Sequence, residues 1–379
     1  MLVLNEEQEL MRNIAREFAE KEVKPFVLEM ELNNKYPAHL VKRMGELGFI
    51  GLPHDESYGG LGGQWTTYSI VLEEISKVSN TLGLLLVLET VMCGVTVAAG
   101  GTLEQKQKWL KPNFDGEKIL AVSMTEPVGG FNYPEWQSRA VQDGDEWVLN
   151  AAKIFTTGAG QADYYIVGCM TSDFDPATNT GLSVFVVPAN TPGVEVGHIE
   201  NKLGWHGSSS GSMYYRNVRV PKENLIGEVN MGANFVNAMA PLECMLNGPM
   251  NLGAAEAAYE KVKTYTKERN QLGKSLYDTH QVIRHKLAKM YMEIESLRSF
   301  TYSTVAMQDE EQFCLPQQFA LKIKGAEVLQ YVANEAIQMH GGNGVVVENG
   351  VESCYRDAKV NAIGGGSNDT LLDMVTTMI

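Results

Sequence analysis

Two glutamates stand in stretches of the chain that are otherwise almost entirely apolar. Glu89 lies in the run LLLVLETVM (84–92), and Glu243 lies in the run PLECMLNG (241–248). Burial among apolar groups disfavours the charged form of a carboxylate and raises its pKa. A carboxylate with a pKa near the working pH can act as a general base. Glu243 and Glu89 are therefore candidate catalytic residues. In the competing interpretation, each glutamate instead reaches solvent from the edge or the start of a helix.

Glycines cluster at two places near the C-terminal end of the chain. Residues 341–344 read GGNG and residues 364–366 read GGG, with Arg356 between them. Glycine loses more conformational freedom on folding than other residues, so such clusters mark unusual backbone angles or a backbone that approaches a ligand closely. We therefore expect a special turn or a ligand-binding surface at each cluster.

The composition limits the class of function. A chain of 379 residues is too long for one compact core, so two or three domains are expected. The formal net charge of −15 argues against nucleic acid and against an anionic membrane surface as partners, because both are themselves negatively charged. A phosphate-bearing ligand is still compatible with this charge, since backbone N–H groups and a few Arg or Lys side chains can hold one.

The cysteines and the apolar runs indicate where the protein resides. The five cysteines are scattered and form no CxxC pair, so neither a disulfide framework nor a metal site is expected. The N-terminal stretch MLVLNEEQELMRNIAREF is charged and amphipathic, so we expect no signal peptide. The longest apolar run, Leu82 to Leu88, is too short to span a membrane and is interrupted by Glu89. We expect a cytoplasmic protein.

The order of the expected elements predicts an α+β fold in three parts. An N-terminal α-helical domain is expected over residues 1–118 and a β-barrel or sandwich domain over residues 119–227, followed by a C-terminal helical bundle over residues 228–379. The helices expected in the first part start at Asn5 and after Pro37, fill residues 66–100 as two long apolar helices, and end with 103–109. The expected β runs are 147–149, 164–169, 182–187 and 212–218. The long helices expected in the last part are 253–270, 280–309 and 317–339.

Five motifs are spread over the whole length of the chain. They are Met124-Thr125-Glu126-Pro127, Lys153-Ile154-Phe155-Thr156-Thr157, Leu203-Gly204-Trp205-His206-Gly207-Ser208-Ser209, Arg269-Asn270-Gln271-Leu272-Gly273 and the stretch from Gln338 to Gly342. Together they resemble the acyl-CoA dehydrogenase family, whose members are flavoenzymes that oxidise the α–β bond of acyl-CoA thioesters. The family fold has the same order of helical, β and helical parts that the residue pattern predicts.

The resemblance implies FAD as the cofactor and a set of contact residues. Implied FAD contacts are Met124, Thr125, Phe155, Thr157, Arg269, Leu272, Gln281, Gln338, Gly342, Ser367 and Asp369. Implied substrate contacts are Val122, Gly130, Phe131, Gly365 and Gly366. In the family, the contacts that match Arg269 and Gln338 come from a neighbouring subunit. The resemblance therefore implies a homotetramer built as a dimer of dimers.

The chain departs from the usual family pattern at the catalytic base. Most members carry a Glu-Gly-Thr triplet whose Glu is the base, but the matching triplet here is Gly365-Gly366-Ser367. A minority of members, including isovaleryl- and long-chain-acting ones, place the base on a helix at the position that matches Glu243. The resemblance therefore implies Glu243 as the base. Glu89, on the helix that lines the acyl pocket in the family, is left as a second acid or base, or as a group that recognises a polar acyl chain.

Several functions fit these residues. The leading interpretation is oxidation of an acyl-CoA to the enoyl-CoA, with electrons passed to an electron-transferring flavoprotein. The same site working in reverse is an enoyl-CoA reductase, and the ending Gly-Gly-Ser-Asn-Asp resembles the crotonobetainyl-CoA reductase branch of the family. A third function is dehydrogenation of a cyclic or unusual acyl-CoA with the help of Glu89. A flavin-binding scaffold without acyl-CoA chemistry is the fourth.

Overall fold

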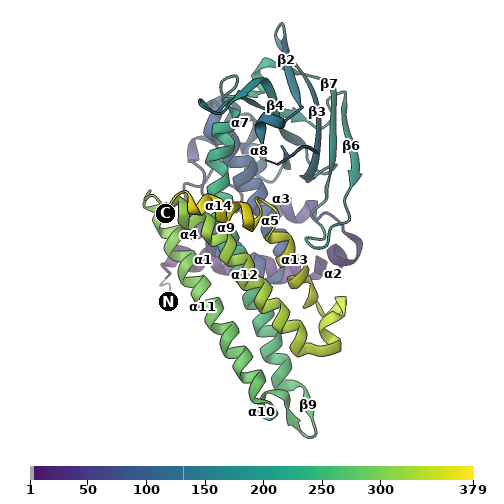
Figure 1. Cartoon of the computed structure of the whole chain (residues 1–379), viewed down its shortest axis with the longest axis vertical. Coiled ribbons are helices and arrows are strands. Elements are labelled where there is room, and N and C mark those ends of the chain that lie inside the picture. The colour runs from purple at the N-terminus through teal and green to yellow at the C-terminus, as the bar shows by residue number, and fades with distance from the viewer. Residues whose placement is uncertain (1–3, 131) are drawn as a thin grey trace.

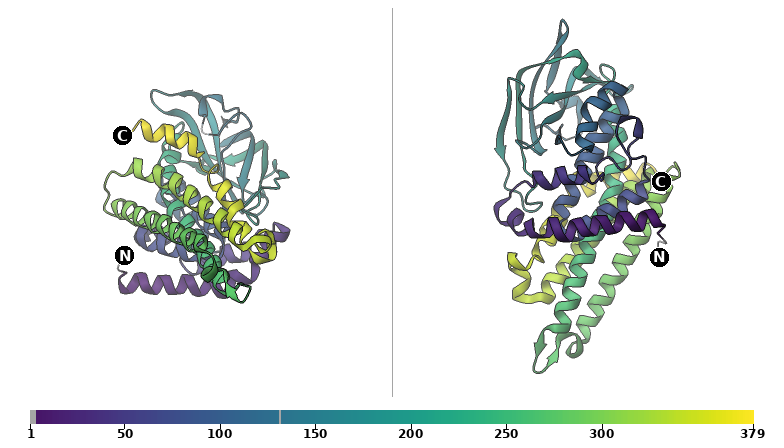
Figure 2. Two further views of the ribbon diagram at one scale, coloured as in Figure 1. Left: turned by 60° about the horizontal axis from the view of Figure 1, so that its bottom comes forward. Right: turned by 180° about the vertical axis from the view of Figure 1, so that it is seen from behind.

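The computed structural model describes residues 4–130 and 132–379 of the chain. A twisted β-sheet lies at one end of the molecule, and helices from the first third of the chain lie across its middle (Figures 1 and 2). Three long helices run toward the opposite end, namely α9 (Gly232–Glu268), α11 (Gln281–Asp309) and α12 (Leu315–His340). This is the order of helical, β and helical parts that the sequence predicts, and the α+β class is confirmed.

The first part of the chain contains helices and connecting loops but no strand among its described residues. Its helices are α1 (Glu6–Phe18), α2 (Lys24–Asn33), α3 (Ala38–Glu46), α4 (Trp65–Val78), α5 (Asn80–Val87), α6 (Thr96–Gly100), α7 (Leu103–Trp109) and α8 (Lys111–Phe114), with π-helical turns η1 (Ala19–Val23) and η3 (Leu88–Val95). The predicted start at Asn5 is confirmed, because its side chain accepts a hydrogen bond from the Gln8 amide at 2.8 Å and Gln8 returns one. The sequence pattern did not predict α2, which continues directly from η1.

The apolar segment Asn80–Gly100 is helical along its whole length. Helical structure continues past Glu89 through η3 into α6, so the segment has 21 residues. Among the described residues it is the one helix that is long and apolar enough to cross a membrane by length and composition. Its most apolar window is 72% buried inside the protein, which is the pattern of a core helix. The two long apolar helices predicted over residues 66–100 are therefore confirmed, and Glu89 within the second one has buried hydrogen-bond partners for its carboxylate.

The middle part forms one mixed sheet. Its strands are β1 (Leu120–Ser123), β2 (Arg139–Asp143), β3 (Glu146–Thr157), β4 (Tyr164–Asp175), β5 (Thr180–Pro188), β6 (Val194–Ile199), β7 (Ser210–Pro221) and β8 (Leu225–Ile226). The order is β6-β7-β3-β2-β4-β5-β8, and β1 pairs in parallel with β4. The four predicted β runs lie within β3, β4, β5 and β7. The pattern missed β1, β2, β6 and β8, which are shorter than these four strands.

Helix α9 is the element that positions the candidate base. We expected a helix to start at Gly253, and this was wrong, because α9 begins at Gly232 and includes Pro241 and Pro249. A proline inside a helix removes one backbone hydrogen bond and usually ends the helix. Here α9 packs against α4, α11 and α12 over most of its length, and this burial maintains the helix through both prolines. Glu243 therefore lies inside a buried helix rather than at an exposed helix start.

The remaining C-terminal elements are short. They are β9 (Asn270–Gln271), β10 (Lys274–Ser275), α10 (Leu276–Thr279), the 3-10 turns η6 (Gly341–Val345) and η7 (Val347–Asn349), α13 (Glu352–Asn361) and α14 (Asn368–Thr376). The turn between α13 and α14 holds Gly364 to Gly366 and lies beside the N-terminal half of α9.

Candidate active site

The carboxylate of Glu243 occupies the space next to Gly365. A Cβ added at Gly365 would collide with Oε1 of Glu243 and would lie 2.8 Å from its Cδ. Gly365 and Gly366 both have left-handed backbone angles, with φ of +66° and +97°, which favour glycine. The two positions that carry the base in different members of the family are thus brought together here. A side chain at position 365 and the observed Glu243 conformation exclude each other.

The surroundings of Glu243 make it more basic than an ordinary glutamate. Met239, Glu243 and Leu246 lie on one face of α9 by their spacing, and the side chain of Glu243 is only 6% exposed. Burial raises the pKa of Glu243 to about 7, and the charge of Lys322 acts in the opposite direction. Within residues 4–130 and 132–379, the backbone carbonyl of Glu243 accepts a hydrogen bond from Nδ2 of Asn247 at 3.0 Å, and its carboxylate forms none. It is therefore available to take a proton near neutral pH.

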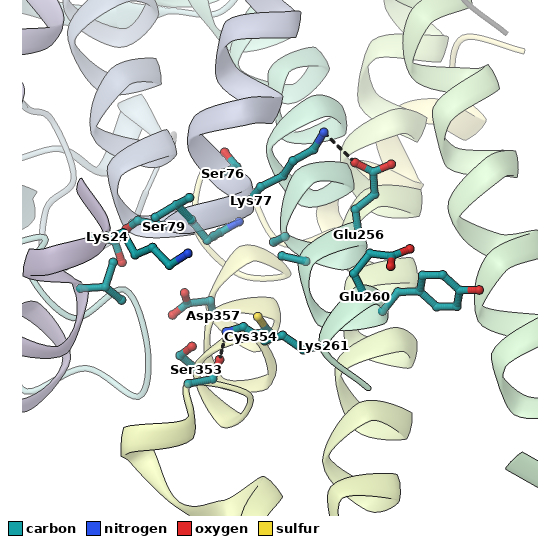
Figure 3. A pocket seen from close by; sticks show the side chains of 18 of the residues that line it. Lys24, Ser76, Lys77, Ser79, Glu256, Glu260, Lys261, Ser353, Cys354 and Asp357 are labelled. Carbon is teal, nitrogen blue, oxygen red and sulfur yellow. Dashed lines mark hydrogen bonds and ion pairs between the residues drawn. The ribbon is translucent and has the colours of Figure 1, made fainter. Parts of the chain in front are cut away.

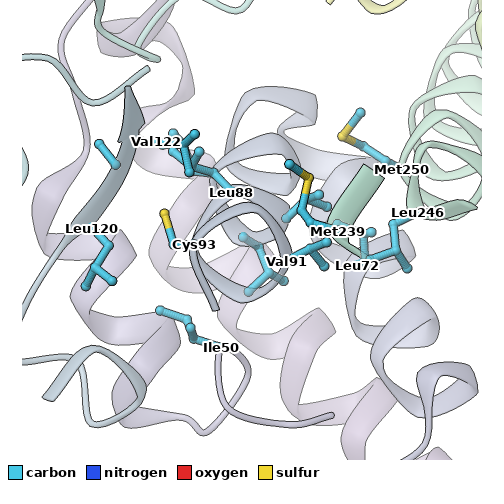
Figure 4. Close-up of a cluster of buried hydrophobic side chains, with 14 of the residues drawn as sticks. Ile50, Leu72, Leu88, Val91, Cys93, Leu120, Val122, Met239, Leu246 and Met250 are labelled. Carbon is cyan, nitrogen blue, oxygen red and sulfur yellow. The ribbon is translucent and has the colours of Figure 1, made fainter. Parts of the chain in front are cut away.

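Apolar side chains surround this part of α9. Figure 4 shows buried side chains from η3, β1 and α9 in one cluster, among them Leu88, Val91, Val122, Met239 and Leu246. Their packing excludes water from the space between these elements. Burial of Glu243 itself is the physical cause of its raised pKa.

Glu89 lies in a different environment. Its side chain is fully buried, and its Oε2 accepts hydrogen bonds from Nδ2 of Asn113 at 2.6 Å and from the amide of Leu120 at 3.0 Å. Burial raises the pKa of Glu89 to about 8. These bonds connect η3 to α8 and to the start of β1, whereas Glu243 contacts the Gly365 turn. The structure does not bring the two glutamates into one shared set of contacts, and a catalytic role for Glu89 stays a prediction.

The loop that carries Met124 and Thr125 is held on strand β3. The amide of Ile154 donates to the carbonyl of Thr125 at 2.9 Å. The buried ammonium of Lys153 donates to the carbonyl of Met124 at 2.9 Å and to the Glu126 carboxylate at 2.8 Å. A buried ion pair of this kind fixes the loop, because breaking it would leave one charge uncompensated. Sequence reasoning placed Lys153 and Glu126 in motifs but did not predict that they pair.

Phe155 is the aromatic residue next to this loop. It has a φ of +53° at an irregularity of the β3–β7 pairing, and its side chain is 58% exposed. A bulky residue with positive φ is rare and marks a special position. An exposed aromatic ring next to Thr157 and close to the loop at Thr125 suits the face of a flat ring system such as a flavin. These residues therefore fit the implied isoalloxazine site.

Five other implied FAD contacts lie at the far end of the molecule. They are Arg269, Leu272, Gln281, Gln338 and Gly342, and all five are exposed. Arg269, Leu272 and Gln281 belong to the tip formed by β9, α10 and the adjoining ends of α9 and α11, opposite the β-sheet (Figure 1). Gln338 and Gly342 lie at the C-terminal end of α12, where His340 stacks on Tyr265 of α9. One chain therefore does not bring them together with Phe155 and Thr125.

The remaining predicted residues lie around the glycine turn and the start of the sheet. Ser367 caps α14 and accepts a hydrogen bond from the Thr370 amide at 3.2 Å, and Asp369 is exposed in the first turn of that helix. Val122 is buried on β1, and the carbonyl of Gly130 accepts a hydrogen bond from Nε1 of Trp136 at 2.7 Å. Phe131 lies outside the described residues.

Comparison with known proteins covers the whole chain. Family models match in three successive parts, the acyl-CoA dehydrogenase N-terminal domain at residues 5–117, the middle domain at residues 121–218 and the C-terminal domain at residues 230–379. The chain belongs to the acyl-CoA dehydrogenase family. It is an oxidoreductase of this FAD-dependent family.

Relatives and solved structures agree with this assignment. A short-chain-specific acyl-CoA dehydrogenase of Clostridium acetobutylicum is 38% identical, over 97% of this chain and 96% of the relative. A subunit of the caffeyl-CoA reductase–Etf complex of Acetobacterium woodii is 32% identical, over 100% of this chain and 99% of the relative. The structure of butyryl-CoA dehydrogenase from Megasphaera elsdenii matches with a TM-score of 0.94 at 32% identity, covering 100% of this chain and 99% of that chain.

The residue that sequence reasoning missed in this family member is Lys322 of α12. Its side chain is fully buried, and its ammonium donates hydrogen bonds to the carbonyl of Gly366 and, at 3.4 Å, to Oδ1 of Asn368. A lysine between Leu321 and Ile323 in an apolar helix was the available signal, because lysine is almost never fully buried unless it is paired.

A separate cavity of about 640 Å³ lies between α2, α4, α9 and α13 (Figure 3). Charged side chains line it, and some of them pair with each other, as Lys77 does with Glu256 at 3.0 Å. None of the predicted catalytic, FAD or substrate residues lines this cavity. Because the candidate base and the implied cofactor and substrate contacts lie elsewhere, we do not place the reaction there. Among the described residues, no group of three or more His, Cys, Asp or Glu side chains is arranged to hold a metal ion.

Proposed function

We propose that the protein dehydrogenates a short acyl-CoA thioester to the enoyl-CoA and that Glu243 removes the proton from the α carbon. The observation that carries the proposal is the position of Glu243, whose buried side chain lies directly against the Gly365 turn. The short acyl chain is proposed because the relatives include short-chain-specific acyl-CoA dehydrogenases and butyryl-CoA dehydrogenase.

Glu243 does its work as the ionised base. With a pKa of about 7, a useful fraction is ionised at neutral pH, and the same burial makes the carboxylate a strong proton acceptor once it is ionised. The left-handed Gly365–Gly366 turn leaves room for the carboxylate, since it carries no side chains. Glu243 is only 6% exposed, so little of the base meets bulk water.

FAD supplies the hydride acceptor for the β carbon when it is bound. Thr125, Phe155 and Thr157 of one subunit would hold its ring system, with the loop at Met124 fixed by Lys153. Arg269 and Gln281 would reach the pyrophosphate of a neighbouring subunit's FAD, because guanidinium and amide donors suit phosphate oxygens.

The separation of the two sets of FAD contacts supports an oligomer. Since one chain keeps Arg269 far from Phe155, we propose a homotetramer built as a dimer of dimers, in which each FAD is completed by a second subunit. Sedimentation of the holoenzyme tests this, and a monomer that retains its flavin would contradict it. We also propose a cytoplasmic location, which cell fractionation would test.

We propose that the electrons pass to an electron-transferring flavoprotein. One relative is named as a subunit of a complex with such a protein. A solved structure that matches the chain with a TM-score of 0.94 is described as an electron transferring flavoprotein of Acidaminococcus fermentans. Mixing the substrate-reduced enzyme with oxidised electron-transferring flavoprotein should reoxidise the enzyme. No electron transfer to this partner would refute the assignment.

The test of the reaction is anaerobic flavin bleaching. The purified holoenzyme is mixed with straight-chain, branched, aromatic and cyclic saturated acyl-CoAs, and loss of the oxidised flavin absorbance is followed. Bleaching by a short saturated thioester is the expected result. A fully loaded enzyme that none of these thioesters bleaches would refute the proposal and favour a flavin-binding scaffold.

A second candidate is an enoyl-CoA reductase built on the same site. Relatives named 3-(aryl)acrylate reductase and caffeyl-CoA reductase subunit are 34% and 32% identical to the chain. The reduced enzyme is mixed with the enoyl-CoAs that match the saturated panel. Reoxidation by an enoyl-CoA without forward bleaching would select the reductase over the dehydrogenase.

A further inference from the structure

Lys322 connects α12 to the glycine turn beside Glu243. Its ammonium donates to the carbonyl of Gly366, the residue after Gly365, and to Oδ1 of Asn368 at the start of α14. The side chain is completely buried. Removing an ammonium from water is costly, so a lysine in such a place must be compensated by hydrogen bonds and by negative charge.

Glu243 is the carboxylate whose charge acts on this ammonium, at a separation longer than that of an ion pair. The two residues interact electrostatically, and the charge of Lys322 favours the ionised form of that carboxylate. Cys244, next to Glu243, does not supply this charge at neutral pH, because burial raises the pKa of its thiol. Lys322 therefore contacts the turn against which Glu243 rests and also influences the charge of Glu243.

Other charged groups on the elements that pack against α9 are engaged elsewhere. These groups are Glu73 of α4 with Arg298 of α11, Glu89 of η3 with Asn113, Asp357 of α13 with the Trp205 amide, and Lys324 of α12 with Glu293 of α11. On α14, Asp369 and Asp373 are exposed. Among the described residues, Lys322 is the charged side chain that acts on Glu243.

We propose that Lys322 is a positioning residue for proton abstraction, which holds the Gly365–Gly366 turn against Glu243 and places a positive charge beside the base. This inference rests on the proposed role of Glu243 in acyl-CoA dehydrogenation. It assigns Lys322 no contact with substrate or FAD. Its two effects are separable, because the hydrogen bond to Gly366 needs only a donor whereas the effect on Glu243 needs a charge.

The test compares four variants of the holoenzyme. Lys322→Met removes donor and charge, Lys322→Gln removes the charge but keeps a donor, and Lys322→Arg keeps both. Lys324→Met is the matched control, since it removes a partly exposed lysine from the same helix. For each variant we would measure flavin content and the rate of bleaching by the best substrate from about pH 5.5 to about pH 9.

The expected result is a shift of the acidic limb of the pH profile. Loss of an opposite charge near a carboxylate raises its pKa by roughly one unit or more, so Lys322→Met and Lys322→Gln should both lose about tenfold in rate below the new midpoint. Lys322→Gln should recover at high pH, whereas Lys322→Met, which also loses the donor to Gly366, should stay slower than Lys322→Gln there. Lys322→Arg and Lys324→Met should keep the wild-type limb. A lower rate at every pH with an unmoved limb would show that Lys322 is only structural and would overturn the proposal.

A second readout does not depend on turnover. Subtracting the infrared spectrum of Glu243→Gln from that of wild type isolates the band of the protonated Glu243 carboxyl group. The pH dependence of this band gives the pKa of Glu243 directly. In a Lys322→Gln background this band should persist to higher pH, and an unchanged midpoint would refute the inference even if Lys322→Met fails to fold. If Glu243→Gln itself bleaches at the wild-type rate, the proposed role of Glu243 as the base is wrong. An acidic limb that does not move in the Lys322 variants refutes only the inference about Lys322, so the two failures can be told apart.

Discussion

Glu243→Gln should make the protein more stable at alkaline pH while it abolishes the base. The pKa of Glu243 is raised from 4.5 to about 7 by burial in the folded protein. At about 1.4 kcal/mol for each pKa unit, this step corresponds to about 3 kcal/mol of stability. The folded state binds the proton more tightly than the unfolded state, so this stability is fully present below pH 4.5 and is lost as the pH rises through about 7. Because glutamine does not titrate, the Glu243→Gln variant does not lose this stability as the pH rises.

Urea unfolding of the holoenzyme measures this difference. Between about pH 6 and about pH 8.5, wild type should lose about 1.5 kcal/mol relative to Glu243→Gln. Both of these pH values lie above the isoelectric point of the protein, which is acidic because the net charge is −15. Glu260→Gln is the matched control, because Glu260 lies on the same helix with a side chain that is 60% exposed. A stability difference between wild type and Glu243→Gln that does not change with pH would refute the reasoning, since Glu243 would then titrate like an ordinary glutamate.

Two further predictions follow from the same contacts. Gly365→Ala should destabilise the protein more than Gly341→Ala does, by at least about 1 kcal/mol in urea unfolding. Both glycines have positive φ, but only at position 365 would the new Cβ collide with Glu243; equal effects would contradict the placement of Glu243. Glu89→Gln should keep most of the bleaching rate and gain stability above about pH 8, because its raised pKa is a cost of burial that glutamine does not carry. A loss of about 100-fold in bleaching with flavin retained would move the base to Glu89.

The sequence predicted the three-part fold because helices and strands have different apolar spacing. The apolar surround of Glu243 and its position in the family also led to Glu243 as the candidate base. The structure shows that this side chain is buried beside Gly365, and its role as the base stays a prediction. The sequence pattern misplaced the start of α9, because Pro241 and Pro249 are local signals for a helix end, whereas the burial that overrides them comes from α4 and α12. Local pattern has no access to such tertiary packing.

The partners of the buried charges could not be read from the sequence. Lys322 bonds to Gly366 and Lys153 bonds to Glu126, and in both cases the partner lies more than twenty residues away in the chain. The spread of the FAD contacts over two ends of the molecule was expected only through the resemblance, because nothing in the spacing of Arg269 and Phe155 indicates which subunit each one serves.

Removal of the α proton of an acyl-CoA by Glu243 is tested most directly by rapid-mixing flavin bleaching. Wild type and Glu243→Gln, both with full flavin occupancy, are mixed anaerobically with butyryl-CoA at about pH 8, where the base should be ionised. We predict rapid bleaching of wild type and a rate at least about 100-fold lower for Glu243→Gln. Near-equal bleaching rates for the two proteins would contradict the role of Glu243 as the base.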